Sequence, residues 1–205
     1  MLNYSDLDPE KSAFVFELDD VLYPHQDYLL QVYYLFANFL EYTETKPQAN
    51  ELTAFLKNMY LNQGSIDLFE KAAKTFGINE KYKENFDRLH VSAQLPLPLL
   101  LYPEVLTLLK SIKNDSKAIY ILTKGNPLMQ LNKLKHIQWE GLDSELRVYF
   151  YDELKLKSKL EPFVYLLTEN NLDINNVLMI GSSREDDENA KSLSVDYLDI
   201  SLLFY

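Results

Sequence analysis

Two carboxylates follow an apolar run near the start of the chain. Residues 13–16 lead into Glu17 and Asp19, and Pro24 then ends the extended segment. Because Glu17 and Asp19 are two residues apart, their side chains point to the same side of an extended backbone. Carboxylates held this close repel unless a proton or a cation lies between them, and a divalent ion such as Mg²⁺ is the natural occupant. The stretch predicts an acidic site at the end of a buried strand; the alternative is an exposed acidic turn.

Two later apolar runs also end in polar residues. Residues 118–122 are followed by Thr123, Lys124 and Gly125. Residues 177–180 are followed by a small-residue turn and an acidic run that includes Asp186 and Asp187. The carboxyl ends of parallel strands lie along one edge of a sheet, so these clusters are expected to converge with the first one.

The combined set has the groups that binding of a phosphoryl group requires. Carboxylates would hold a metal, the Thr123 hydroxyl and the amides after it would bind phosphate oxygens, and Lys157 would supply a fixed cation. Taken singly, each residue has an ordinary structural role, with Thr123 as a helix cap and Lys157 as a solvated lysine. Their order along the chain favours a site.

The composition indicates an acidic globular protein. The 205 residues carry a net charge of −11, so nucleic acid is an unfavourable partner. No apolar run reaches membrane-spanning length and residues 1–11 lack a signal-peptide core, so no membrane partner is expected. The chain has no Cys, which is compatible with a reducing cytoplasm, the predicted location.

The order of the predicted elements indicates an α/β fold with a helical insertion. After Pro103, helical segments alternate with apolar strands, which is typical of a doubly wound parallel sheet of the Rossmann-like kind. Between Pro24 and Pro96, apolar residues follow helical spacing in four segments without a strand. The predicted division is therefore a core of residues 1–24 and 96–205 and an all-helical unit of residues 25–95.

The first predicted helix of that unit carries a run of aromatic residues. They are Tyr33, Tyr34, Phe36, Phe39 and Tyr42. Their spacing favours packing in a helical core over a ligand-binding box.

In this order the motifs resemble those of the haloacid dehalogenase-like (HAD) hydrolase superfamily. Family members carry a strand followed by Asp-x-Asp-x-Thr/Val, which residues 17–21 resemble, and an apolar strand ending in Ser or Thr, which residues 121–125 resemble. A Lys six residues before a Phe is matched by Lys157, and Gly-Asp-Ser with a later Asp is similar to residues 181–187. The ending Leu-Tyr-Pro of the first motif is similar to the branch of pyrimidine nucleotidases and related small phosphatases, whose helical cap corresponds to the helical unit here.

The resemblance implies roles for the site residues. Glu17 stands where the family has the Asp that forms an aspartyl-phosphate, and Asp19 stands at the general acid/base. Phosphate-binding positions would be Thr123, Lys124, Gly125 and the catalytic Lys157. Mg²⁺ would be held by Glu17, Asp19 and Asp187, with Asp186 as the alternative to Asp187.

Two departures from the family pattern fall on the chemistry. Glu17 carries its carboxylate one carbon further out than Asp, about 1.5 Å, and a misplacement near 1 Å can cost about a hundredfold in rate. Ser182 stands where the family has an acidic magnesium ligand, and a neutral hydroxyl is a poor substitute for it. We therefore expect Mg²⁺ binding to be weak or absent.

Two functions follow from these residues. In the first, the protein is a phosphohydrolase of a small phosphorylated metabolite that uses Glu17 as its nucleophile. In the second, it is a catalytically impaired relative that binds a phosphorylated ligand or a protein partner. Dehalogenation of a haloacid is less favoured, because it also needs the nucleophilic Asp.

Overall fold

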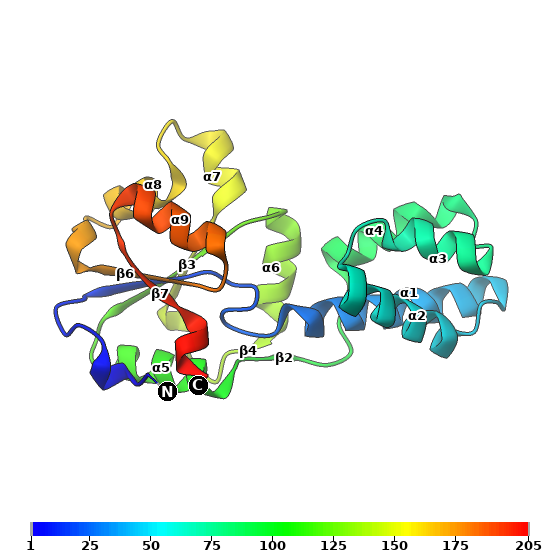
Figure 1. The fold of residues 1–205 in the computed structure, drawn as a ribbon, viewed down its shortest axis with the longest axis horizontal. Coiled ribbons are helices and arrows are strands. Elements are labelled where there is room, and N and C mark those ends of the chain that lie inside the picture. The colour runs from blue at the N-terminus through cyan, green and yellow to red at the C-terminus, as the bar shows by residue number, and fades with distance from the viewer. Residues whose placement is uncertain (1, 205) are drawn as a thin grey trace. The chain divides into compact units, whose positions relative to one another are not determined.

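The computed structural model describes residues 2–204, and its contacts divide the chain into two compact units (Figure 1). The first unit comprises Met1–Pro24, Leu99–Gln130 and Ile137–Tyr205. The second comprises His25–Pro98 and Leu131–His136. In the described part of the chain, no helix is both long enough and apolar enough to span a bilayer.

The first unit is built on a five-stranded sheet with the order β5-β3-β1-β6-β7, in which all neighbours are parallel. The strands are β1 (Ala13–Phe16), β3 (Ala118–Thr123), β5 (Leu146–Phe150), β6 (Val177–Gly181) and β7 (Asp196–Asp199). The central strand β1 is buried along its whole length, which explains its unbroken apolar sequence. A separate pair joins β2 (Leu99–Leu100) to β4 (Ile137–Gln138). The predicted doubly wound α/β fold is confirmed.

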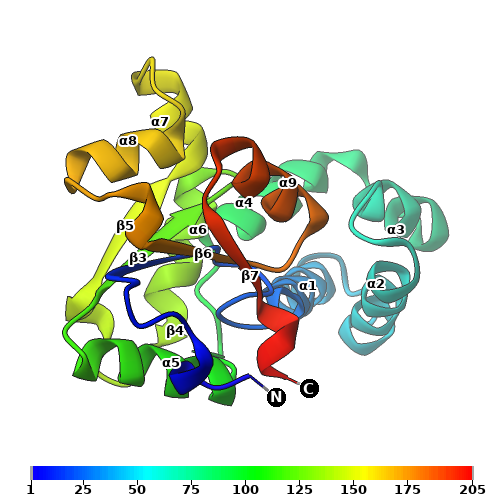
Figure 2. The same ribbon diagram turned by 60° about the vertical axis from the view of Figure 1, so that its left-hand side comes forward.

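Helices cover both faces of the sheet. They are α5 (Pro103–Asn114), α7 (Tyr151–Lys157), α8 (Pro162–Glu169) and α9 (Arg184–Leu193); a further helix, α6 (Pro127–His136), begins in this unit and continues into the second one. Figure 2 shows α8 and α9 on one face and α5 on the other. On the α8/α9 face, Val15, Leu122 and Met179 of three neighbouring strands pack with Phe163 and Ala190 in one buried cluster.

The sequence did not predict α7. The strand β5 ends at Phe150, and the helix begins at the next residue, Tyr151, without a Gly or Pro to separate them. Asp152 and Glu153 in its first turn favour this start, because their charges complement the helix dipole.

The second unit contains four main helices and, within residues 25–98, no strand. They are α1 (His25–Glu44), α2 (Ala49–Gln63), α3 (Leu68–Phe76) and α4 (Lys83–Ser92). Tyr33 and Phe36 are buried, and the Phe36 ring meets the Phe86 ring edge-on at 4.9 Å. Core packing is thus confirmed for these two rings but is wrong for Tyr34 and Tyr42, which are exposed.

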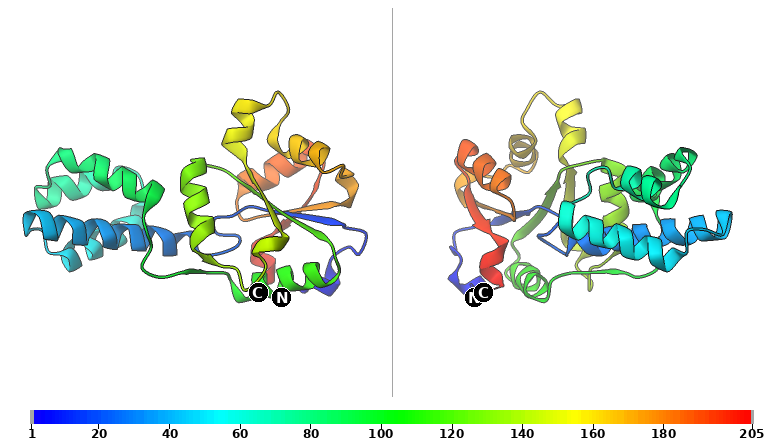
Figure 3. Two further views of the ribbon diagram at one scale, coloured as in Figure 1. Left: turned by 180° about the vertical axis from the view of Figure 1, so that it is seen from behind. Right: turned by 45° about the vertical axis from the view of Figure 1, so that its right-hand side comes forward.

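Short 3₁₀ helices complete the list: Tyr4–Asp6, Glu80–Tyr82, Asp143–Glu145, Ile174–Asn176 and Ile200–Leu203. The two ends of the described chain lie side by side, since Leu2 donates its backbone N–H to the carbonyl of Leu202 at 2.9 Å (Figure 3). This bond joins the start of the first unit to its last helical turn.

Candidate active site

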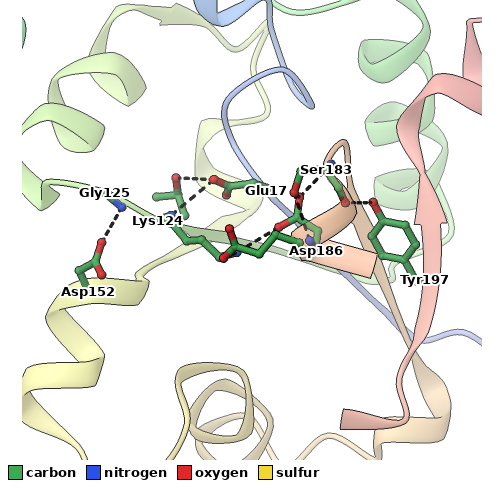
Figure 4. Close-up of polar contacts among 9 residues, drawn as sticks. Glu17, Lys124, Gly125, Asp152, Ser183, Asp186 and Tyr197 are labelled. Carbon is green, nitrogen blue, oxygen red and sulfur yellow. Dashed lines mark hydrogen bonds and ion pairs between the residues drawn. The ribbon is translucent and has the colours of Figure 1, made fainter. Parts of the chain in front are cut away.

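Polar side chains from three neighbouring strands meet at the carboxyl edge of the sheet. Glu17 follows β1, Lys124 follows β3, and Asp186 lies in the first turn of α9 after β6 (Figure 4). All three border one cavity of about 20 Å³, whose remaining lining is largely apolar. A cavity of that size holds roughly one water molecule. The predicted convergence of the three clusters is observed.

The carboxyl group of Glu17 is turned back onto the protein. Its Oε2 accepts the backbone N–H of Leu18 at 2.7 Å, and its Oε1 lies 3.4 Å from both the Thr123 hydroxyl and the Lys124 amide nitrogen. Burial raises the pKa of Glu17 to about 8, the charges of Asp19 and Asp186 add to this, and the amides partly offset it. Glu17 is therefore mostly protonated at neutral pH.

Asp19 is oriented by two side chains. The Tyr23 hydroxyl donates to its Oδ1 at 2.7 Å, and Gln130 Nε2 donates to its Oδ2 at 3.1 Å. Both donors stabilise the ionised carboxylate.

Gln130 connects Asp19 to the end of β3. Its Nε2 also lies 3.0 Å from Thr123 Oγ1 and 2.5 Å from the carbonyl oxygen of Lys124. A carbonyl only accepts, so the amide nitrogen must face it. Thr123 in turn donates to Glu17. Hydrogen bonds therefore connect the buried Gln130 side chain both to the Asp19 carboxylate and, through Thr123, to the Glu17 carboxyl group.

Lys124 and Asp186 form the charged centre of the site. The Lys124 ammonium lies 3.2 Å from Asp186 Oδ1 and 2.8 Å from Glu185 Oε1. Burial by itself lowers the pKa of Lys124, but these ion pairs outweigh burial and raise it. Asp186 Oδ2 accepts the hydroxyl of Ser183 at 2.7 Å and its backbone N–H at 3.2 Å, which closes a capping box at the start of α9.

Two glycines allow this close packing. At Gly181 an added Cβ would lie 2.7 Å from the Asp186 Cβ, so only Gly fits between β6 and α9. Gly125 has a φ of 100°, a conformation that L side chains rarely adopt. Its N–H donates to Asp152 Oδ2 of α7 at 2.6 Å. A carboxylate of the chain itself thus occupies a backbone donor that was predicted to bind phosphate.

Some predicted site residues lie away from this cluster. Lys157, the last residue of α7, is exposed and pairs with Glu153 one turn earlier. Asp187 points along α9 to Lys191, at 2.5 Å, whereas Asp186 faces the cavity. At the cavity the cation is therefore Lys124 and the carboxylate is Asp186, whereas Lys157 and Asp187 do not border it.

The residues at this edge do not fit a magnesium ion. In residues 2–204, no three His, Cys, Asp or Glu side chains are grouped so that they could share a metal ion. Both oxygens of Asp186 accept from protein donors, one oxygen of Glu17 accepts from Leu18, and Ser182 is exposed and neutral. Because Mg²⁺ requires oxygens directed at one point, this donor set does not provide a site for it.

Sequence reasoning missed Gln130 and Asp152. Gln130 is the fourth residue of α6 and Asp152 the second of α7, and neither belongs to a strand-end cluster. Their positions at the start of helices that follow β3 and β5 were the available signal, since helix starts also lie at the carboxyl edge of such a sheet.

Comparisons with known proteins identify the family and the fold. The family model described as haloacid dehalogenase-like hydrolase matches residues 11–193, while no curated protein sequence matches significantly. Among 130 matching solved chains is the HAD-hydrolase YfnB from Bacillus subtilis bound to magnesium, with a TM-score of 0.58 and 17% identity over 91% of this chain and 87% of that one.

Two other structures have similar scores. A hydrolase from Streptococcus pneumoniae TIGR4 gives a TM-score of 0.52 at 19% identity, covering 92% of both chains. The defluorinating L-2-haloacid dehalogenase Rha0230 gives 0.57 at 15% identity, covering 92% of this chain and 82% of that one. At these identities the structural likeness concerns the fold, and the family model adds the membership. The chain therefore belongs to the haloacid dehalogenase-like hydrolase family.

Proposed function

We propose that this chain is a catalytically impaired member of the family that serves as a binding module. The observation that carries the proposal is the state of Glu17, the residue at the nucleophile position. Its carboxyl group is hydrogen-bonded to the backbone N–H of Leu18, and its pKa of about 8 leaves it mostly protonated at neutral pH. A protonated carboxyl group that is bound to its own backbone is a poor nucleophile.

The groups that would hold a phosphoryl group support the same proposal. The Gly125 N–H is bound to Asp152, and the Lys124 ammonium is bound to Glu185 and Asp186. The cavity beside Glu17 has room for about one water, which is too small for a phosphate. Phosphoryl transfer relies on positioned donors and cations, and here those groups already have partners inside the protein.

A small phosphorylated metabolite is the ligand class that we propose for the module, because Thr123 ends β3 and Lys124 and Gly125 follow it directly, which places a hydroxyl, a cation and backbone N–H groups together. Such a ligand would have to displace Asp152 from Gly125 and Glu185 from Lys124, so we expect weak binding. We propose that the helical unit has the role of the family's cap. Nucleic acid and membrane are not proposed as partners, in keeping with the net charge of −11.

Phosphohydrolase activity is the second candidate. The observation that favours it is the orientation of Asp19, which Tyr23 and Gln130 hold as a general acid/base would need to be held. The magnesium-bound Bacillus subtilis relative belongs to the same comparison set. Dehalogenation remains less favoured, since it too needs an ionised carboxylate at position 17.

Turnover of an aryl phosphate with Mg²⁺ tests the proposal. The proteins compared are wild type, Glu17→Asp, Ser182→Asp and the double variant. We expect no turnover above background for wild type, because its nucleophile and its metal ligand are both altered. The double variant should gain more than the product of the two single gains, since both groups act on one phosphoryl transfer.

A wild-type rate of about 1 s⁻¹ or more, which is ordinary for an enzyme, would reject the impaired assignment and favour the phosphohydrolase. A panel of phosphorylated metabolites and a haloacid, assayed in the same way, extends the test to the other candidate reactions. The matched control is Ser201→Asp, which adds the same charge in the last 3₁₀ helix instead of at the site.

A further inference from the structure

The position of the Lys124 ammonium is the feature that the proposed function leaves unexplained. The side chain is partly buried, its Nζ lies between carboxylates of α9, and its own backbone N–H faces Glu17. Lys124, Glu17 and Asp186 border the same cavity of about 20 Å³. A positive charge of the chain itself thus lies at the acidic edge for which the resemblance to the family implies a magnesium ion.

The carboxylates around it need a counter-charge. Asp186 is almost fully buried, and burying an ionised carboxylate without a paired cation is strongly unfavourable. Asp19 and Glu185 add further acidic groups at the same edge. In the described structure Lys124 supplies the cation that pairs with Asp186, and the two Ser183 donors satisfy the other oxygen.

We propose that the Lys124 ammonium replaces the divalent cation at this edge of the sheet, so that the protein is stable and keeps its site geometry without a metal ion. A covalently attached cation neutralises the Asp186 carboxylate at any metal concentration, and it occupies the point on which the Asp186 and Glu185 oxygens converge. The proposal goes beyond the loss of turnover, because it concerns the stability of the folded chain and is tested without any substrate.

The test measures the thermal midpoint of wild type, Lys124→Met and Lys113→Met in EDTA and in millimolar MgCl₂, with NaCl matching the ionic strength. Lys113 is the matched control, because it is a similarly exposed lysine of the same unit that pairs with Glu145 at 3.2 Å. Wild type and Lys113→Met should have the same midpoint in both solutions. Lys124→Met should melt several degrees lower in EDTA and recover part of the loss in MgCl₂, since the freed carboxylates can then accept Mg²⁺.

Two results would overturn the proposal. One is a rise of the wild-type midpoint in MgCl₂ beyond the NaCl control, which would mean that a metal binds beside Lys124. The other is a Lys124→Met chain that behaves like Lys113→Met in both solutions. If Lys124→Met does not fold, calorimetric titration of wild type with MgCl₂ decides: no binding heat supports the proposal, and saturable binding rejects it. If the chain is instead an active phosphatase, the turnover assay shows it. The thermal midpoints do not depend on turnover, so the two proposals fail separately.

Discussion

Burial determines the chemistry of Glu17 more than its type does. The same carboxyl group on an exposed turn would be ionised at neutral pH, whereas here desolvation raises its pKa to about 8. The neighbouring negative charges act in the same direction. A residue type that suggests a nucleophile therefore becomes a neutral hydrogen-bonding group.

The raised pKa of Glu17 predicts a pH dependence of stability. Between its unfolded pKa, about 4.3, and its folded pKa the native chain holds a proton that the unfolded chain has lost. The contribution of Glu17 to the free energy of unfolding is thus fully present below the unfolded pKa. It falls as pH rises from the unfolded to the folded pKa, with a slope of up to about 1.4 kcal/mol per pH unit. Glu17→Gln lacks this titration. The free energy of unfolding of the variant minus that of wild type, measured by urea unfolding, should therefore increase from pH 5 to pH 8.

The control for that measurement is Glu10→Gln, an exposed residue before β1. Its difference from wild type should stay constant with pH. If the Glu17→Gln difference is equally constant, Glu17 is ionised in the native protein, and the main support for an impaired nucleophile is lost.

At the scale of elements, the close approach of β6 and α9 sets the position of Asp186. The strand ends at Gly181, and Ser183 caps the helix by accepting the backbone N–H of Asp186. The Asp186 carboxylate in turn accepts the backbone N–H of Ser183. The capping box is thus also the device that orients one of the charged groups of the site. Replacing Gly181 would therefore disturb the helix cap and the orientation of Asp186 together.

Gly181→Ala is accordingly expected to destabilise the protein. Its Cβ would meet the Asp186 Cβ at 2.7 Å and Oδ2 at 2.8 Å, so strand and helix must move apart. Overpacking of this kind costs about 1–3 kcal/mol of unfolding free energy. Urea unfolding measures it, with the exposed neighbour Ser182→Ala as the control that should stay near wild type. Equal urea midpoints for Gly181→Ala and Ser182→Ala would contradict this, because they would show that small shifts relieve the contact between the new Cβ and the Asp186 side chain.

For the whole molecule, the excess of acidic residues is the dominant electrostatic property. Asp and Glu number 31 against 20 Lys and Arg, which gives the net charge of −11. Several surface pairs, such as Lys83 with Asp87 and Arg184 with Glu188, lie one turn apart on a helix and contribute little each. Repulsion between the unbalanced carboxylates therefore opposes the folded state.

Screening that repulsion should stabilise the protein. Raising the NaCl concentration from about 0.01 M to 0.15 M shortens the Debye length from about 30 Å to 8 Å. We expect the thermal midpoint at neutral pH to rise over this range, and to rise less at a pH near the isoelectric point of about 4.7, where the net charge is small. A midpoint that falls with salt at neutral pH would mean that favourable ion pairs outweigh the repulsion.

The sequence by itself determined the architecture. Unbroken apolar runs at residues 13–16, 118–122 and 177–180 predicted buried strands, and their alternation with helical segments indicated a doubly wound parallel sheet. It also predicted that polar clusters lie along one edge, because the carboxyl ends of parallel strands do so. The replacement of two acidic family positions by Glu17 and Ser182 could likewise be seen without coordinates.

Only the tertiary structure decided which groups face one another. On a helix one residue turns a side chain by about 100°, so motif spacing could not separate Asp186, which meets Lys124, from Asp187, which meets Lys191. Hydrogen bonds between separate elements, such as Gln130 to Asp19 and Gly125 to Asp152, depend on how α6 and α7 pack. The raised pKa of Glu17 arises mainly from burial, which local sequence does not encode; the charge of nearby Asp19 could be read from the sequence, but the approach of Asp186 could not.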